Sequence, residues 1–150
     1  MSDLGSLYQE LILDHSRRPR NRGTLENPSA RAEGANPLCG DELILYVDVA
    51  DDTVREVRFE GHGCAISTAS ASLMSEAVRG KTTAEALDLF KRFHASLVAG
   101  PATEVDVSDL GKLAALTGVR DYPMRVKCAS LAWHTLNAAL EGSSDTVTTE

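Results

Sequence analysis

Three cysteines and one aspartate lie in settings typical of metal ligands. Cys39 and Asp41 flank Gly40 at the start of an apolar segment, and Cys64 follows a Gly-His-Gly sequence. Residues i and i+2 of an extended chain project to the same side, so the Cys39 thiol and the Asp41 carboxylate would face one point. Cys64 would precede a helix, whose N-terminus favours the thiolate form. These residues are therefore candidates for a metal or thiol site.

Cys128 is the third thiol, and it lies on the last expected helix. If that helix crosses the sheet end where Cys39, Asp41 and Cys64 meet, three thiolates and one carboxylate would surround a tetrahedral ion such as zinc. An odd number of cysteines in a reducing compartment favours metal binding or reactivity over disulfides. Free cysteines are also common as small buried apolar residues, so spacing alone leaves that alternative open.

Two cations lie next to Cys128 in the sequence. Zinc with four anionic ligands would leave a site charge of about −2, which is costly to desolvate. Arg125 precedes Cys128 by one helical turn, and Lys127 is its immediate neighbour. Either side chain could partly neutralise the site, and Arg125 could also hold a partner's carboxylate or carbonyl. The alternative is an ordinary solvated helix start.

The four histidines are weaker candidates, although histidine is the commonest metal ligand. His15, His94 and His134 fall on helices, and we assign them structural roles. His62 lies two residues before Cys64 and could tune that thiol from outside the ligand set.

Alternating apolar residues predict the strands that position the site. Leu43 to Val49 is the strongest strand, and a second around Val57 to Phe59 follows a tight turn at Asp51-Asp52. Arg31 to Pro37 is a weaker strand candidate. Antiparallel pairing of the two stronger strands would bring Cys39, Asp41 and Cys64 to one sheet end.

Helical periodicity predicts the remaining elements. Proline, glycine and capping residues bound helices at about 4–15, 65–78, 83–97, 108–117 and 123–140. The expected fold class is α+β, with a small antiparallel sheet of about three strands packed against helices. We expect a single domain over residues 1–142 and a disordered tail over 143–150, which lacks apolar periodicity.

Composition restricts the function classes. The chain has 150 residues, 43% of them apolar, and a formal charge of −7. No apolar stretch approaches the roughly 20 residues that span a bilayer, and no export signal opens the chain, so we expect a cytoplasmic protein. The acidic balance argues against nucleic acid as a partner. A basic cluster at Arg17 to Arg22 is either a solvated helix end or a docking patch for an acidic protein.

Several segments together closely resemble the SufU branch of the IscU and NifU N-terminal family. The resemblance covers nearly the whole chain except the tail, and that family has a small antiparallel sheet packed against helices. Lys127 stands where the IscU pattern has a histidine, and the connector from Gly100 to Val107 is longer; both departures favour the SufU branch. The matching segments are Leu11–His15, Pro19–Gly23, Asn36–Asp41, Gly61–Ser67 and Lys127–Trp133.

The resemblance implies an activity and its partners. It implies that Cys39, Asp41, Cys64 and Cys128 bind zinc, and that Cys39 accepts sulfur from a PLP-dependent cysteine desulfurase of the SufS type. A desulfurase histidine would replace Cys39 on zinc, and Arg125 would assist in opening the site or holding the partner. The Cys39 persulfide would then pass to the SufBCD assembly complex. The chain would be a zinc-dependent sulfurtransferase with Cys39 and Arg125 as its catalytic residues.

Three other functions remain open from the sequence. An iron-sulfur cluster scaffold could use the same ligands. A zinc-stabilised interaction module would use its metal only to hold the fold. A thiol hydrolase using Cys64 with His62 would need an orienting acid and a substrate pocket, neither of which the sequence identifies.

Overall fold

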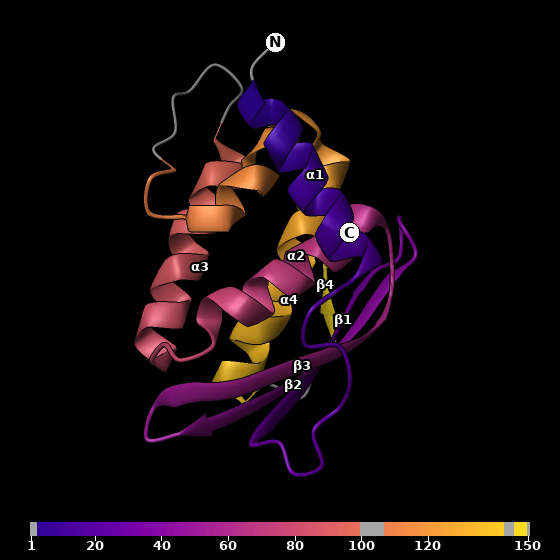
Figure 1. Ribbon diagram of the computed structural model, residues 1–150. Coiled ribbons are helices and arrows are strands. Elements are labelled where there is room, and N and C mark those ends of the chain that lie inside the picture. The colour runs from indigo at the N-terminus through magenta and orange to yellow at the C-terminus, as the bar shows by residue number, and fades with distance from the viewer. Residues whose placement is uncertain (1–2, 100–106, 143–145, 150) are drawn as a thin grey trace.

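The computed structural model describes residues 3–99, 107–142 and 146–149, in which helices gather above a small sheet (Figure 1). Proline at N1 begins the last α-helix, and a capping box between Thr82 and Glu85 begins the third. The helices are α1 (Asp3–Arg17), α2 (Ala65–Val78), α3 (Thr83–Val98), the 3₁₀ helix η1 (Gly111–Asp121) and α4 (Pro123–Glu141).

The sheet contains β1 (Ala30–Asn36), β2 (Asp41–Ala50), β3 (Thr53–His62) and β4 (Val147–Thr148), in the order β3-β2-β1-β4. The first three strands are antiparallel neighbours, as expected. The β2–β3 turn consists of two aspartates with positive φ angles of 52° and 59°. The hairpin predicted around Asp51-Asp52 is thus present, with longer strands than expected.

Two expectations for the sheet need correction. Over the described residues the sheet has four strands and is mixed, rather than about three antiparallel strands, because β4 pairs in parallel with β1. Part of the tail expected to be disordered therefore forms backbone hydrogen bonds; Thr149 N–H, for example, donates to Ala35 O at 3.2 Å. Periodicity could not reveal so short a strand, since two paired residues need no apolar face. Residues 143–145 and 150 lie outside the described part of the chain.

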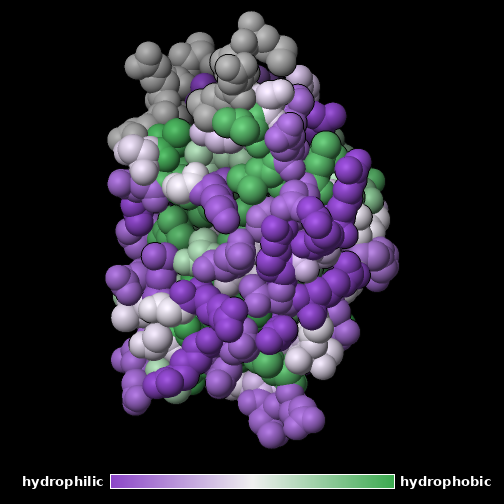
Figure 2. All heavy atoms as spheres, in the orientation of Figure 1, coloured by the Kyte–Doolittle hydropathy of each residue, from purple (hydrophilic) through white to green (hydrophobic). Residues whose placement is uncertain are grey.

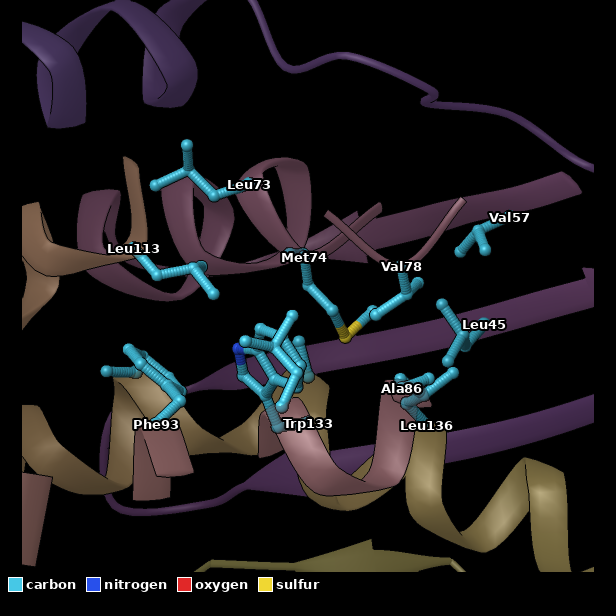
Figure 3. Close-up of a cluster of buried hydrophobic side chains, with 14 of the residues drawn as sticks. Leu45, Val57, Leu73, Met74, Val78, Ala86, Phe93, Leu113, Trp133 and Leu136 are labelled. Carbon is cyan, nitrogen blue, oxygen red and sulfur yellow. The ribbon is translucent and has the colours of Figure 1, made fainter. Parts of the chain in front are cut away.

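The core lies between the sheet and the helices. Leu43, Leu45 and Val47 alternate along β2 and are buried, as the strand pattern predicted. Helices α2 and α4 pack on the same sheet face, while α1 lies on α2 and α3 on α4. Figure 3 shows side chains from β2, β3 and the covering helices around fully buried Trp133. The helices that carry Cys64 and Cys128 therefore rest on a packed core.

The fourth expected helix differs from the structure. A short helix was expected over 108–117, whereas residues 111–121 form a 3₁₀ helix, and α4 follows after one residue, Tyr122. The connector from residue 100 to 106 lies outside the described residues. Among the helices that are described, none combines the length and apolar composition required to cross a bilayer.

Candidate metal centre

The β1–β2 hairpin places Cys39 and Asp41 at one end of the sheet. Asn36, the last residue of β1, is the cross-strand partner of Asp41, the first residue of β2. The loop between them turns through Gly40, whose φ of +72° favours glycine, and Cys39 N–H donates to Asn36 O at 3.2 Å. Cys39 is half-buried at this loop, whereas Asp41 is buried.

Cys64 is the N-cap of α2, directly after β3. Its backbone N–H donates to Asp41 Oδ1 at 2.8 Å, and its Sγ lies 3.9 Å from Asp41 Oδ2. The Ser67 N–H donates to Cys64 Sγ at 3.4 Å. A Cβ on Gly63 would lie 2.6 Å from Asp41 Oδ1, so glycine is required for this close approach.

Cys128 lies in the second turn of α4 and is buried. The Ser70 hydroxyl of α2 donates to Ala129 O of α4 at 2.5 Å, which links the helices that carry Cys64 and Cys128. Cys128 Sγ lies 3.4 Å from Cys39 Sγ. Residues distant in sequence therefore meet above the end of the sheet.

The donor atoms fit a small divalent ion. Ligand atoms of Cys39, Asp41 and Cys128 all lie within 4.8 Å of one another. Cys64 is outside that set, but its sulfur is at 3.9 Å from Asp41 and it borders the same groove. Thiolate sulfur with one carboxylate oxygen is a donor set that suits zinc, and sulfur ligands also suit iron-sulfur clusters.

The Cys128 thiol resists deprotonation at its buried position. Burial raises the pKa of the Cys128 thiol well above its usual range, and its hydrogen-bonded neighbours Cys39, Cys64 and Asp41 raise it further. Without metal this thiol is protonated at neutral pH. A metal that binds its sulfur must therefore displace a proton.

An open groove of about 850 Å³ borders all three cysteines. Helix α1 forms one wall, and the segment from η1 into α4 forms the other. The walls are mainly apolar, and large apolar side chains beside the groove remain exposed, as Tyr122 and Met124 illustrate. The groove-lining side chains of α1 are Tyr8, Gln9, Ile12 and Leu13.

Arg125 lines this groove in the first turn of α4 and is exposed. Its guanidinium carbon lies 4.8 Å from the centre of the Tyr122 ring, a cation–π geometry. Arg125 thus borders the same groove as Cys128. The backbone carbonyl of Lys127 accepts a hydrogen bond from Thr149 Oγ1 at 3.2 Å, so the tail contacts the α4 turn beside Cys128.

The histidines occupy two kinds of position. Buried His15 contacts Ser72 Oγ through Nδ1 at 2.7 Å, and the rings of His94 and His134 pack edge to face with 5.3 Å between centroids. His62 is exposed, and its Nε2 lies 3.1 Å from Glu42 Oε2. Glu42 could serve as the orienting acid of the thiol-hydrolase alternative, but the described residues show no contact between the His62 ring and the Cys64 thiol.

The basic cluster is largely paired within the chain. Arg18 and Arg20 contact the Asp14 carboxylate at 2.7 and 2.6 Å, and these two hydrogen bonds lower the pKa of Asp14, that from Arg20 most. Arg22 donates to Gly61 O at 2.6 Å. These contacts within the chain favour the interpretation as a solvated helix end and turn over an open docking patch for these three arginines.

Asn36 has a place at the site that residue types alone did not indicate. Its side chain is fully buried, and its Nδ2 lies 3.8 Å from Cys128 Sγ. The available signal was the hairpin register, which makes Asn36 the partner of Asp41.

Comparison with known proteins gives a consistent assignment. Residues 7–140 match the family model described as "NifU-like N terminal domain". The chain is 42% identical over 135 residues to the zinc-dependent sulfurtransferase SufU of Bacillus subtilis, covering 90% of each chain. It is 39% identical over 145 residues to the iron-sulfur cluster assembly scaffold protein IscU of Streptococcus pyogenes, covering 97% of this chain and 89% of that one.

Solved structures share the fold. A crystal structure described as a SUF-system iron-sulfur cluster assembly scaffold protein, from Fervidobacterium islandicum, superposes with a TM-score of 0.82 at 42% identity. That match covers 90% of this chain and 97% of the other. A NifU-like N-terminal protein of Brucella abortus superposes with a TM-score of 0.76 at 27% identity, covering 94% and 96%.

Proposed function

Because the chain belongs to the NifU-like N-terminal domain family of iron-sulfur cluster assembly proteins, we propose that it is a zinc-dependent sulfurtransferase. In this proposal Cys39 accepts sulfur from the persulfide of a SufS-type cysteine desulfurase. The observation that carries the proposal is the half-buried Cys39 thiol, which lies 3.4 Å from Cys128 Sγ and borders an open groove. The similarity to the Bacillus sulfurtransferase supports the same function.

The sulfur transfer is a balanced exchange between thiolates. The Cys39 thiolate attacks the outer sulfur of the partner's persulfide, and a new S–S bond forms on Cys39. The S–S bond of the donor breaks at the same time, and the partner cysteine leaves as a thiolate. The step needs no external oxidant, because one S–S bond replaces another. The open groove gives a partner residue access to Cys39.

The four residues Cys39, Asp41, Cys64 and Cys128 would hold the zinc. Zinc, when bound, would supply the positive charge that keeps the sulfurs deprotonated at neutral pH. Asp41 is held between the strands and α2 by its hydrogen bond from Cys64 N–H. Exposed Arg125 would bind an acceptor group on the partner at the rim of the groove.

The partners in this proposal are the desulfurase, which brings the PLP, and the SufBCD complex, which receives the sulfur. We place the reaction in the cytoplasm, where reducing conditions keep the three cysteines free of disulfides. The wide apolar groove supports a protein partner rather than a small substrate.

The deciding experiment follows sulfur by mass. The zinc-loaded protein is mixed with a SufS-type desulfurase and labelled cysteine, alkylated, digested and analysed by mass spectrometry beside metal analysis. We expect one zinc per chain and label on Cys39, and we expect Cys39→Ala to abolish both labelling and stimulation of the desulfurase. Label confined to Cys64 or Cys128 would contradict the proposal. Undiminished stimulation by Cys39→Ala would favour the interaction-module alternative.

A cluster scaffold is the second candidate, and the similarity to proteins named IscU favours it. The same cysteines would then bind an iron-sulfur cluster. Anaerobic incubation with iron, desulfurase and cysteine distinguishes the two functions. A sulfurtransferase stays colourless with zinc retained, whereas a scaffold develops the visible absorption of thiolate-bound iron.

A further inference from the structure

The pair at the base of the β1–β2 hairpin contacts two different cysteines. Asp41 accepts a hydrogen bond from the backbone of Cys64, while Asn36, directly across the ladder, directs its amide Nδ2 to Cys128 Sγ at 3.8 Å. Cross-strand partners project to the same sheet face, so both side chains reach the helices above it. The hairpin that presents Cys39 therefore also holds the two helix-borne thiols.

The three sulfurs differ in their N–H donors. Cys128 Sγ faces the Asn36 amide, and Cys64 Sγ accepts the Ser67 backbone N–H at 3.4 Å. Among the described residues, Cys39 Sγ has a contact with the Cys128 thiol and no N–H donor. An N–H donor withdraws charge from a thiolate sulfur and makes it less nucleophilic, so Cys39 keeps the most available electron pair.

Fold stability does not explain a buried asparagine at position 36. Its side chain is 0% exposed, and its Oδ1 has no hydrogen-bond partner among the residues that the structure describes. A buried amide with one unpaired group carries a desolvation cost that an apolar residue of similar size would avoid. The amide N–H toward Cys128 is the only polar contact of this side chain that the described residues provide.

The geometry points to Asn36 as a positioning residue that keeps Cys128 as the retained sulfur, so that Cys39 is the one that reacts. This inference rests on the proposed function and deepens it by assigning the selection among three thiols. Asn36 contacts neither the partner nor the transferred sulfur. It acts through the hydrogen bond to Cys128, and loss of that bond makes the sulfurs more alike.

The test uses Asn36→Leu, which removes the amide and keeps a side chain branched at Cγ, and the matched control Thr135→Val. Thr135 is also fully buried and polar, but it bonds to Leu131 O within α4. We expect Asn36→Leu to bind zinc about 10- to 100-fold more weakly in chelator competition. Its cobalt form should show a shifted thiolate-to-cobalt band, and sulfur label should appear on Cys128 as well as Cys39. Thr135→Val should match the wild type in all three.

The wild-type arm separates the two proposals. If wild-type protein takes no label on Cys39, the proposed function fails whatever the variants do. If wild type labels only Cys39 while Asn36→Leu keeps its zinc affinity, cobalt band and label position, Asn36 has no positioning role. Should Asn36→Leu fail to fold, Asn36→Asp, which keeps the shape without the amide donor, gives the same three readings.

Discussion

At the scale of single residues, metal binding depends on how closely the donor residues can approach one another as much as on which residues supply the donors. Cys39, Asp41, Cys64 and Cys128 supply donors, but Gly63 lets Asp41 and the Cys64 backbone meet at 2.8 Å. Arg125 adds an exposed guanidinium at the groove. Two substitutions separate these contributions.

Gly63→Ala should weaken metal binding. The new Cβ would lie within 2.6 Å of Asp41 Oδ1, so the carboxylate or the α2 N-terminus must move. We expect about 1–3 kcal/mol lower stability and a roughly tenfold or greater loss of zinc affinity. Chemical unfolding and chelator competition measure these effects. Gly118→Ala is the control, since its Cβ would meet no atom within 4 Å, and equal losses in both variants would contradict this role.

Arg125→Ala should slow sulfur transfer without removing metal. A charged hydrogen bond contributes about 1.5–3 kcal/mol, so we expect a roughly 10- to 100-fold loss in kcat/KM for desulfurase stimulation. Zinc content should stay at the wild-type level. The control is Arg55→Ala, an exposed arginine at the distant β2–β3 turn, which pairs with Asp51. A loss of zinc in Arg125→Ala would instead indicate a structural role.

At the scale of elements, two contacts hold the frame of the site. His15 joins α1 to α2 through Ser72, which also accepts a hydrogen bond from Arg20 N–H at 2.8 Å. The second contact joins β4 to β1 and, through Thr149, to the turn of α4 beside Cys128. Neither contact involves a side chain of the four proposed ligands.

Protonation of His15 should weaken the α1–α2 contact. Burial, followed by the Arg20 charge, lowers the pKa of His15 below its usual 6.5. The unfolded chain then binds a proton more readily than the native chain, so stability falls as pH drops through 6.5 toward the native pKa. The slope is at most about 1.4 kcal/mol per pH unit for this group.

Urea unfolding of metal-free protein at pH 7.5 and 5.5 measures this loss. His15→Gln should show a smaller loss than the wild type, whereas exposed His62→Gln should not. His134, whose pKa is also lowered by burial, accounts for part of the remaining dependence. Identical pH slopes for wild type and His15→Gln would exclude this role.

Truncation after Gly142 should loosen β1. It removes β4 and the Thr149 contacts, a few hydrogen bonds worth about 0.5–1.5 kcal/mol each. We expect a stability loss of about 1–3 kcal/mol and faster amide exchange in β1, measured by hydrogen–deuterium exchange. Deletion of Glu150 alone is the control. Unchanged exchange in β1 would mean that β4 contributes nothing to this edge.

At the scale of the whole molecule, one core supports both walls of the groove. Trp133 packs against Phe93 with 5.2 Å between ring centroids and ties α3 to α4. Figure 2 shows hydrophilic side chains predominating over the lower part of the visible face, where β2 and β3 lie, with hydrophobic ones gathered higher. The proposed ligands come from the β1–β2 hairpin, the start of α2 and α4, all of which pack on this core. Metal binding at the end of the sheet should therefore stabilise the fold as a whole.

Zinc should raise the melting temperature. A ligand at 100 times its Kd adds about 2.7 kcal/mol, and 1 kcal/mol corresponds to about 2–4 °C for a chain of this size. We expect a rise of about 5–11 °C in calorimetry, reversed by a chelator. A Cys128→Ser variant should show a much smaller rise. If zinc and chelator leave the melting temperature of the wild type unchanged, these residues do not hold zinc.

The sequence alone determined the nature of the fold and the list of ligand candidates. Period-2 and helical apolar patterns place β2, β3 and four helices, because each buries one face. Glycine-bounded turns singled out Cys39, Asp41 and Cys64, and composition and spacing added Cys128. The family resemblance in the motifs supplied an expected activity.

Only the tertiary structure decided what depends on contacts between distant segments. It showed Cys128 Sγ 3.4 Å from Cys39, β4 on the edge of β1, and Asn36 reaching Cys128 across 92 positions of sequence. It also showed Arg18 and Arg20 paired with Asp14. Local patterns report which face of an element is buried, whereas these contacts depend on how whole elements pack, and short-range periodicity carries no information about that packing.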